Sequence, residues 1–438
     1  MIRKYVLFTF KRYYGEFIVI GKDNIPFGDS LIFAPNHINA LQDAIAVHSV
    51  IPANLPLVFL ARSDIFKNKH VAKFLNFAKI IPAFRLRDGI ENLGKNNEIF
   101  NQCIDILNNN CAIGIMPEGN QEIERRLRPL VKGVFRIAFA AQNKFQQHKD
   151  VSIIPVGIDY GDLIKSNKHL IISIGKPIPI SSFISDYNSN PVLTTNEIKD
   201  KLQNELSELT LDLATDNYYK CFERVVYIVD KALLINLELV DNTVNRFKAR
   251  QIAAKILVSL EKNRIEELNK LDVLSLKYVE TLQKYNLKSS AFENTLTKPK
   301  FILNLLSLVS TCMFFILGLM LNFAPFFIPV FIRKYILKPE FVGFYSSLQF
   351  GIGLITFPLF YVIQTLLFAV FLCKIWWMVL LFMFIQYPFG KLSLWWYRKF
   401  VKYCASIRYL FLKKRKTIQL NELEAIYNQI VNVIITSK

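Results

Sequence analysis

Hydrophobic and polar residues alternate in two ways along the first part of this chain of 438 residues. Short apolar runs rich in β-branched and aromatic residues are separated by longer segments in which apolar residues recur at helical spacing. We predict strands at 16–21, 30–35, 56–61, 111–117, 151–158 and 170–178, and helices at 38–50, 68–78, 94–109 and 131–146. Several of these strands are apolar throughout, as in parallel sheets that helices cover on both faces. Residues 16–180 are therefore predicted to form an α/β domain with a mixed, largely parallel sheet and flanking helices.

The pattern changes after residue 180. Segments such as "NEIKDKLQNELSELTLDLA" carry apolar residues at helical spacing on a charged background, which predicts amphipathic helices. We interpret 181–300 as a helical region without recognisable chemistry, a scaffold that packs on the α/β layer or on a membrane.

A third pattern begins near residue 301, where charged residues become rare. Three long apolar stretches, at 301–332, 341–372 and 375–390, are close to or above the roughly 20 residues that cross a bilayer as a helix. We predict that 301–390 is a transmembrane helical region. Pro325 and Pro329 interrupt the first stretch, so a re-entrant or interfacial course stays open there, and with it the number of spans.

The net charge of +19 gives the chain a strongly basic character. Excess Lys and Arg indicate nucleic acid or an anionic lipid surface as the partner. Basic clusters flank the apolar stretches, and the sequence holds no RNA-binding signature, so we expect membrane phospholipids and no nucleic acid. Residues 1–15 are predicted to form an interfacial amphipathic segment, and 391–438 a basic cytoplasmic tail.

The six cysteines are scattered and form no C-x-x-C pair. This spacing predicts neither a disulfide framework nor a zinc site. It is typical of a reduced compartment. We therefore expect an integral membrane protein whose α/β domain faces the cytoplasm.

Candidate chemistry appears first in "LIFAPNHINALQDAIAV", at 31–47. His37 follows a predicted buried strand, and the carboxyl ends of such strands are where open α/β sheets bind ligands. Asp43 lies six residues further on. A carboxylate bonded to one imidazole nitrogen fixes the tautomer and makes the other nitrogen a better proton acceptor. The same pattern also fits a helix-capping histidine and a solvated aspartate.

Two further blocks follow in order. The segment "IIPAFR" ends an apolar run at Arg85, and "IMPEGN" places Glu118 and Gly119 in a turn after a predicted strand. Pro-Glu-Gly is also ordinary turn chemistry. The arginines that follow, at 125, 126 and 128, are interpreted as a lipid-facing or solvated basic patch.

A basic–glycine pair, Lys132-Gly133, closes this block, and Ile154-Pro155-Val156 forms a last one. Taken in order over about residues 30–160, these segments resemble the four sequence blocks of the glycerolipid acyltransferases, the family of lysophosphatidate and glycerol-3-phosphate acyltransferases. The family usually has four residues between its histidine and aspartate, whereas this chain has five.

The resemblance implies an acyltransferase-type fold and transfer of a fatty acyl group from acyl-CoA or acyl-carrier protein. The acceptor would be a hydroxyl of glycerol-3-phosphate or 1-acylglycerol-3-phosphate, in phospholipid biosynthesis. It implies His37 as the general base and Asp43 as the residue that orients it. Neither a metal nor a bound cofactor is expected. The matched residues expected to bind substrate are Asn36, Arg85, Glu118, Gly119 and Lys132.

A hypothesis from another class stays open. The basic clusters and the long apolar region also fit a non-catalytic membrane protein that binds or transports lipid, with the α/β domain holding headgroups. Acylation by the protein would favour the first hypothesis, and lipid movement without acylation the second.

Overall fold

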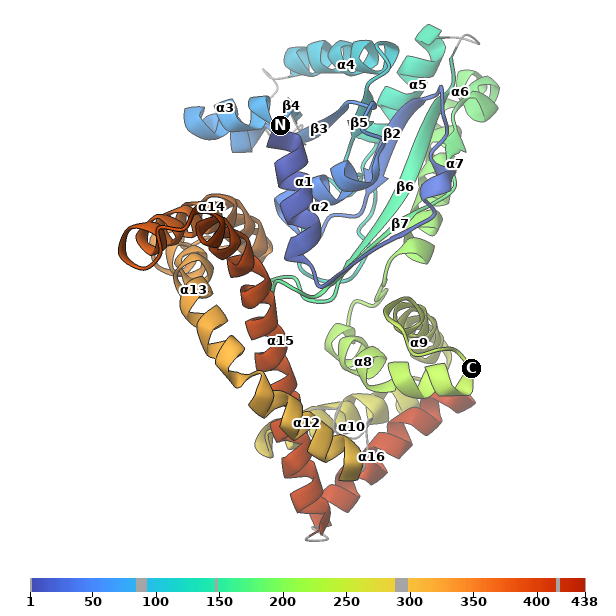
Figure 1. Ribbon diagram of the computed structural model, residues 1–438. Helices are drawn as coiled ribbons and strands as arrows, with labels where there is room; N and C mark the ends of the chain where they lie inside the picture. Colours follow the sequence, from blue (N-terminus) through green and yellow to red (C-terminus); the bar gives the residue numbers. More distant parts are fainter. Residues whose placement is uncertain (1, 84–92, 146–148, 288–297, 415–417, 438) are drawn as a thin grey trace. The chain divides into compact units, whose positions relative to one another are not determined.

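A computed structural model describes residues 2–83, 93–145, 149–287, 298–414 and 418–437 (Figure 1). The chain divides into two compact units. One consists of residues 1–212 together with 341–347, and the other of 213–340 together with 348–438.

The first unit is built on an eight-stranded sheet with the order β1-β7-β6-β2-β5-β3-β4, in which β8 also pairs with β6. The strands are β1 (Glu16–Ile20), β2 (Ser30–Pro35), β3 (Leu57–Arg62), β4 (Ile80–Ala83), β5 (Ala112–Gly114), β6 (Val151–Tyr160), β7 (His169–Ile174) and β8 (Ile178–Pro179). Only β7 and β8 run antiparallel to β6, and all other pairs are parallel. The predicted mixed, largely parallel sheet is confirmed.

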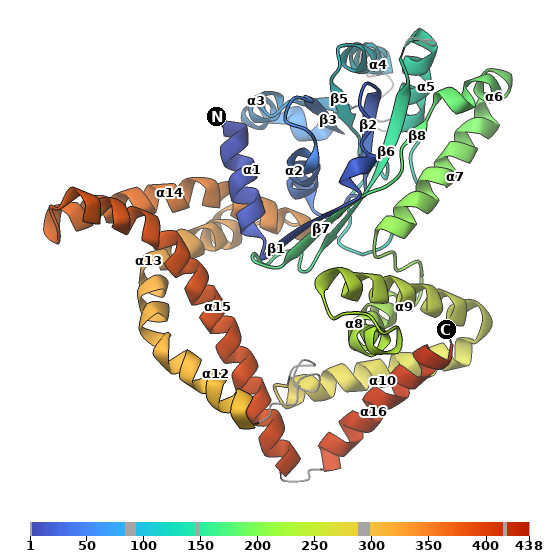
Figure 2. The same ribbon diagram turned by 45° about the vertical axis from the view of Figure 1, so that its right-hand side comes forward.

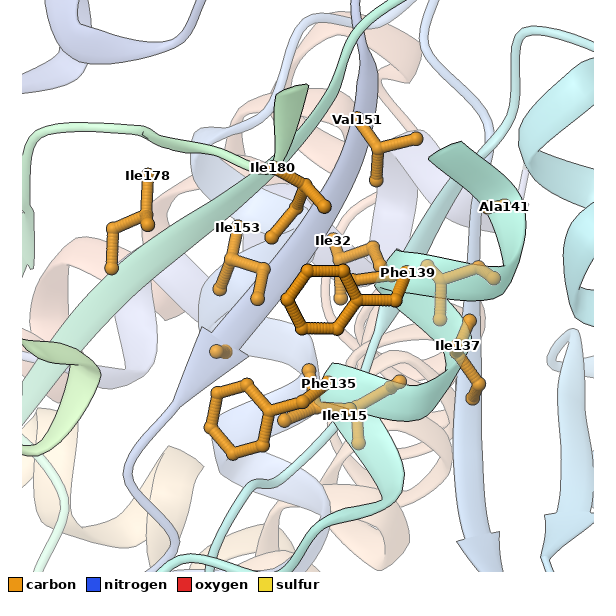
Figure 3. Packing of buried hydrophobic residues seen from close by; sticks show 14 of the residues in the cluster. Ile32, Ile115, Phe135, Ile137, Phe139, Ala141, Val151, Ile153, Ile178 and Ile180 are labelled. Carbon is orange, nitrogen blue, oxygen red and sulfur yellow. The ribbon is translucent and has the colours of Figure 1, made fainter. Parts of the chain in front are cut away.

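The first unit also contains helices, which flank this sheet (Figures 1 and 2). They are α1 (Ile2–Tyr13), α2 (Ala40–Val50), α3 (Lys69–Phe77), α4 (Leu93–Asn108), α5 (Gly133–Phe145), α6 (Ile184–Ser189) and α7 (Pro191–Leu209). The apolar face of α5 presents Phe135 and Phe139 to Ile32 of β2 and Ile153 of β6, and all four are fully buried (Figure 3). Because β2 and β6 are buried along their whole length, this core fixes the two central strands whose ends carry the candidate chemistry.

The second unit is helical. It contains α8 (Tyr219–Asn236), α9 (Thr243–Asn263), α10 (Ile265–Lys284), α12 (Lys298–Ser310), α13 (Cys312–Phe331), most of α14 (Tyr345–Phe371), α15 (Trp376–Lys414) and α16 (Ile418–Thr436). In the part of the chain that the structure describes, three helical stretches are long and apolar enough to cross a bilayer, Cys312–Leu337, Val342–Phe371 and Trp376–Lys414. Most of their large apolar side chains are exposed, as expected for helices that meet lipid.

Polar side chains hold these three helices together. The hydroxyl of Tyr361 in α14 donates to Oδ1 of Asn322 in α13 at 2.6 Å. Nδ2 of Asn322 donates to the carbonyl of Gln386 in α15 at 3.1 Å, and Nε2 of Gln386 donates to Oγ1 of Thr365 at 2.9 Å. Such side-chain hydrogen bonds favour helix association in a bilayer, where water cannot replace them.

Candidate active site

His37 and Asp43 meet at the carboxyl end of β2. Nδ1 of His37 lies 2.9 Å from Oδ2 of Asp43. The His37 side chain is 18% exposed and that of Asp43 is fully buried. Since Nδ1 faces the carboxylate, Nε2 is the ring nitrogen that remains for a substrate. The predicted contact between the two residues is therefore present despite the five-residue spacer.

Asp43 is fixed on both of its oxygens. Oδ2 also accepts hydrogen bonds from the backbone N–H groups of Ile38 and Asn39, at 3.0 and 2.8 Å. Oδ1 accepts one from the hydroxyl of Tyr160, at the end of β6, at 2.7 Å. A buried carboxylate needs such partners to stay charged. Asp43 is thus held in one place, and with it the imidazole of His37.

The extra residue in the spacer coincides with an unusual backbone. Ala40, the first residue of α2, has a φ of +40°. This is the left-handed region, in which a Cβ atom is unfavourable. The backbone turns there so that Asp43, in the first turn of α2, reaches back to His37.

Glu118 holds the backbone of His37 from the end of β5. Its Oε1 accepts a hydrogen bond from the His37 N–H at 2.9 Å, and its Oε2 accepts one from Nε of Arg128 at 2.7 Å. Nη2 of Arg128 donates in turn to the His37 carbonyl at 2.9 Å. Burial raises the pKa of Glu118, and the charge of Arg128 opposes that rise. The structure therefore places Glu118 against the general-base candidate itself.

Arg128 was not expected at the site. Its side chain is only 12% exposed, and Arg125 is also buried, so the interpretation of these two residues as a lipid-facing or solvated patch is wrong. Nη1 of Arg128 is buried and has no hydrogen-bond partner among the described residues. A buried donor of this kind carries a desolvation cost unless something binds it. It can accommodate an anionic or carbonyl oxygen beside His37.

Gly119 allows the turn after Glu118. Its φ of +67° lies in the left-handed region, and a Cβ there would lie 3.2 Å from Cγ1 of Val131. Glycine adopts this backbone conformation without strain, and because it has no Cβ, Val131 can pack close to the turn.

Asn36 braces the two central strands. Its Nδ2 donates to the carbonyl of Ile158 at 3.2 Å, and its Oδ1 accepts from the N–H of Ile158 at 2.7 Å. The side chain thus continues the pairing of β2 with β6 past Pro35.

Two predicted site residues remain, Lys132 and Arg85. Lys132 is exposed, directly before α5. Arg85 lies outside the described residues.

A buried ion-pair cluster contacts the backbone of Tyr160. Arg125 contacts Asp159 and donates to the carbonyl of Tyr160, and Nε2 of His169 lies 3.2 Å from the Asp159 carboxylate. Only the tertiary fold brings these three residues together, since Asp159 and His169 come from β6 and β7 and Arg125 from the segment after β5.

A small cavity opens beside the dyad. Its lining residues are Asn36, Ile38, Glu118, Arg125, Arg126, Leu127, Ile158, Asp159, Thr210 and Leu211. Asn36 and Ile38, the residues on both sides of His37 in the sequence, belong to this lining, so the cavity lies next to the backbone that carries His37.

Comparisons with known proteins agree with this geometry. The sequence profile of the family described as "Acyltransferase" matches residues 16–159. "Glycerol-3-phosphate O-acyltransferase 1" of Saccharomyces cerevisiae is 29% identical over 106 residues, which make up 24% of this chain and 14% of the yeast protein. The chain thus matches only a small part of that relative's length.

One solved structure is also similar in part. The crystal structure of the 1-acyl-sn-glycerophosphate (LPA) acyltransferase PlsC from Thermotoga maritima covers 46% of this chain and 77% of its own, with 19% identity and a TM-score of 0.33. A likeness at this level carries no argument about function.

Proposed function

We propose that the protein is a membrane-bound O-acyltransferase. It moves a fatty acyl group from acyl-CoA or acyl-carrier protein to a hydroxyl of glycerol-3-phosphate or 1-acylglycerol-3-phosphate. The match of residues 16–159 to the acyltransferase profile and the partial similarity to the yeast glycerol-3-phosphate acyltransferase support this proposal. The observation that carries the proposal is the 2.9 Å contact between His37 and the buried Asp43.

The contact supports general-base catalysis. Nε2 of His37 takes the proton of the acceptor hydroxyl while its oxygen attacks the thioester carbonyl, and Asp43 stabilises the imidazolium that forms. The tetrahedral intermediate then collapses with cleavage of the carbon–sulfur bond. The leaving thiolate takes the proton back from His37, so the enzyme returns to its starting state.

Anion binding is proposed for the basic residues around the site. Arginine suits a phosphate because its planar fork can donate two parallel hydrogen bonds. We propose that Arg85 and Lys132 bind the phosphate of the acceptor, with Nη1 of Arg128 as a further donor. Asn36, Glu118 and Gly119 shape the approach to His37.

The location follows from the apolar helices. Three helical stretches that could cross a membrane fit an enzyme whose acceptor or product is a lipid. We propose that the acyltransferase domain faces the cytoplasm, where acyl thioesters are made.

The test is an acylation assay with membranes that contain the full chain. Labelled acyl-CoA or acyl-carrier protein is supplied with glycerol-3-phosphate, 1-acylglycerol-3-phosphate or an unphosphorylated 1-acylglycerol. His37→Ala should lower the rate with the phosphorylated acceptors by about 10²–10⁴-fold, and His70→Ala, at an exposed histidine of α3, should leave it unchanged. A folded His37→Ala protein as active as the parent would refute the base assignment. Transfer to none of the acceptors would refute the function.

A further inference from the structure

The start of the second candidate span belongs to the first unit. Residues 341–347 cluster with the acyltransferase domain. Within this segment Ser346 is 2% exposed and makes two hydrogen bonds to the start of α2. Its Oγ donates to Oδ1 of Asn39 at 2.7 Å, and its carbonyl accepts from Nε2 of Gln42 at 3.2 Å.

These two contacts lie on either side of the strained residue in α2. Asn39 is the N-cap of the helix, and its backbone N–H donates to Asp43. Gln42 directly precedes Asp43 and is fully buried. Between them lies Ala40, with its φ of +40°. Strained backbone of this kind persists where surrounding contacts hold it in place.

Gln42 also connects this turn to the N-terminal segment. Its Oε1 accepts a hydrogen bond from the hydroxyl of Tyr14 at 3.1 Å, and Tyr14 is buried directly after α1. The amide of Gln42 is therefore engaged on both its oxygen and its nitrogen. Together with the Tyr160 hydroxyl on Asp43, these contacts hold the first turn of α2 from three distant parts of the sequence.

We propose that Ser346 is a positioning residue for the His37–Asp43 pair. It holds the first turn of α2 in the strained conformation that brings the Asp43 carboxylate to the imidazole. The first turn of α14 thereby completes the site of the acyltransferase domain. The inference rests on the proposed function, because the pair is assigned its role there.

The neighbouring residue provides a matched control. Ser347 is also buried, at 7% exposure, but its hydroxyl has no hydrogen-bond partner among the described residues. Ser346→Ala removes a hydroxyl that holds α2, whereas Ser347→Ala removes a hydroxyl of the same size that holds nothing described. Ser346→Thr keeps the hydroxyl donor and should retain part of the activity that Ser346→Ala loses.

Ser346→Ala should lower kcat of acyl transfer about tenfold and leave the KM of both substrates within about twofold, because substrate contacts are retained. The limb of the pH profile of kcat that reports the general base should shift, since the carboxylate beside the imidazole is no longer held in place. Ser347→Ala should match the parent in both measurements. Unchanged kcat in Ser346→Ala, or an effect confined to KM, would overturn the proposal.

Hydrogen exchange gives a readout that does not depend on activity. In the full chain in detergent micelles, Ser346→Ala should speed exchange of the backbone amides at 38–43 relative to Ser347→Ala. If the parent acylates no acceptor, the proposed function fails, and this comparison alone decides whether Ser346 holds the turn. Equal exchange in the two variants would overturn the positioning role.

Discussion

His48, in the last turn of α2, is a half-buried histidine outside the proposed mechanism. Its Nδ1 is buried and has no hydrogen-bond partner among the residues that the structure describes, and its ring lies 5.6 Å from that of Phe59. Burial lowers the pKa of His48 from 6.5 to about 4, and the positive charge of Arg3 adds to this effect. The folded state therefore favours the neutral imidazole.

A pH dependence of stability follows. The contribution of neutral His48 is fully present above pH 6.5 and is lost as the pH falls towards 4, because the unfolded chain takes up a proton first. At pH 5 the loss amounts to ~1–2 kcal/mol. His48→Phe should reduce the difference in unfolding free energy between pH 7.5 and pH 5 by this amount. Denaturant unfolding in detergent micelles measures it.

The control is His70→Phe, the same change at an exposed histidine in α3, which should leave the pH dependence as it is in the parent. An equal pH dependence in His48→Phe and the parent would show that the imidazole is accessible to protons in the folded state.

At the scale of residues, the sequence was informative where a motif is local. His37, Asp43 and Glu118 stand in short recognisable segments. Tyr160 and Arg128 contact these residues across long stretches of chain, 117 positions in the case of Tyr160 and Asp43. A lone tyrosine at a strand end and one arginine among several carry no signal of such contacts, because only the sheet order brings them together.

At the scale of elements, two glycines allow α13 and α15 to approach closely. A Cβ on Gly318 of α13 would lie 2.2 Å from the carbonyl oxygen of Phe389 in α15, and a Cβ on Gly390 would lie 2.6 Å from Oδ1 of Asn322. Small residues at such crossings let helix backbones pack in a bilayer, where the hydrophobic effect does not drive association.

Gly318→Ala should therefore force the two helices apart and destabilise their packing by about 1–3 kcal/mol. The matched control is Gly351→Ala in α14, where an added Cβ meets no atom within 4 Å. Thermal unfolding of the purified protein in one detergent compares the two variants. A Gly318→Ala protein as stable as Gly351→Ala would mean that α13 and α15 do not pack through this glycine.

The elements themselves could be predicted where apolar runs are long. The strands at the centre of the sheet, β2 and β6, begin at the predicted residues, because buried strands are apolar throughout. The short edge strand β4 was missed, since the proline within "IIPA" argues against a strand. α15 continues past residue 390 as one helix, although Pro388 and Gly390 stand at the end of its apolar part.

At the scale of the whole molecule, contacts within each unit restrict how the chain crosses a membrane. Within the second unit α16 packs against α10, and Lys277 pairs with Glu422. No candidate span occurs between the first unit and α10 in the part of the chain that the structure describes. In a bilayer, the two ends of the apolar region would then lie on one side. The three candidate spans would in that case not each cross it once.

The segment at 341–347 indicates which stretch departs from a simple crossing. Because this segment, the start of the second candidate span, belongs to the first unit, the end of the first candidate span and the start of the second would lie on the side of the candidate active site. The stretch Cys312–Leu337 would then begin and end on that side, as a re-entrant or interfacial segment. Pro325 and Pro329 interrupt this helix, and α14 and α15 would cross as a pair.

Labelling from one side of the membrane tests this arrangement. Each protein keeps a single cysteine in a background from which the other native cysteines are removed, and sealed vesicles are treated with a membrane-impermeant maleimide. Phe344→Cys should react from the same side as Lys22→Cys, because both positions belong to the first unit and are exposed. Native Cys373, in the turn between α14 and α15, should react from the opposite side. Reaction of Phe344→Cys from the side of Cys373 would separate this segment from α2, and the stretch before it would then cross the bilayer after all.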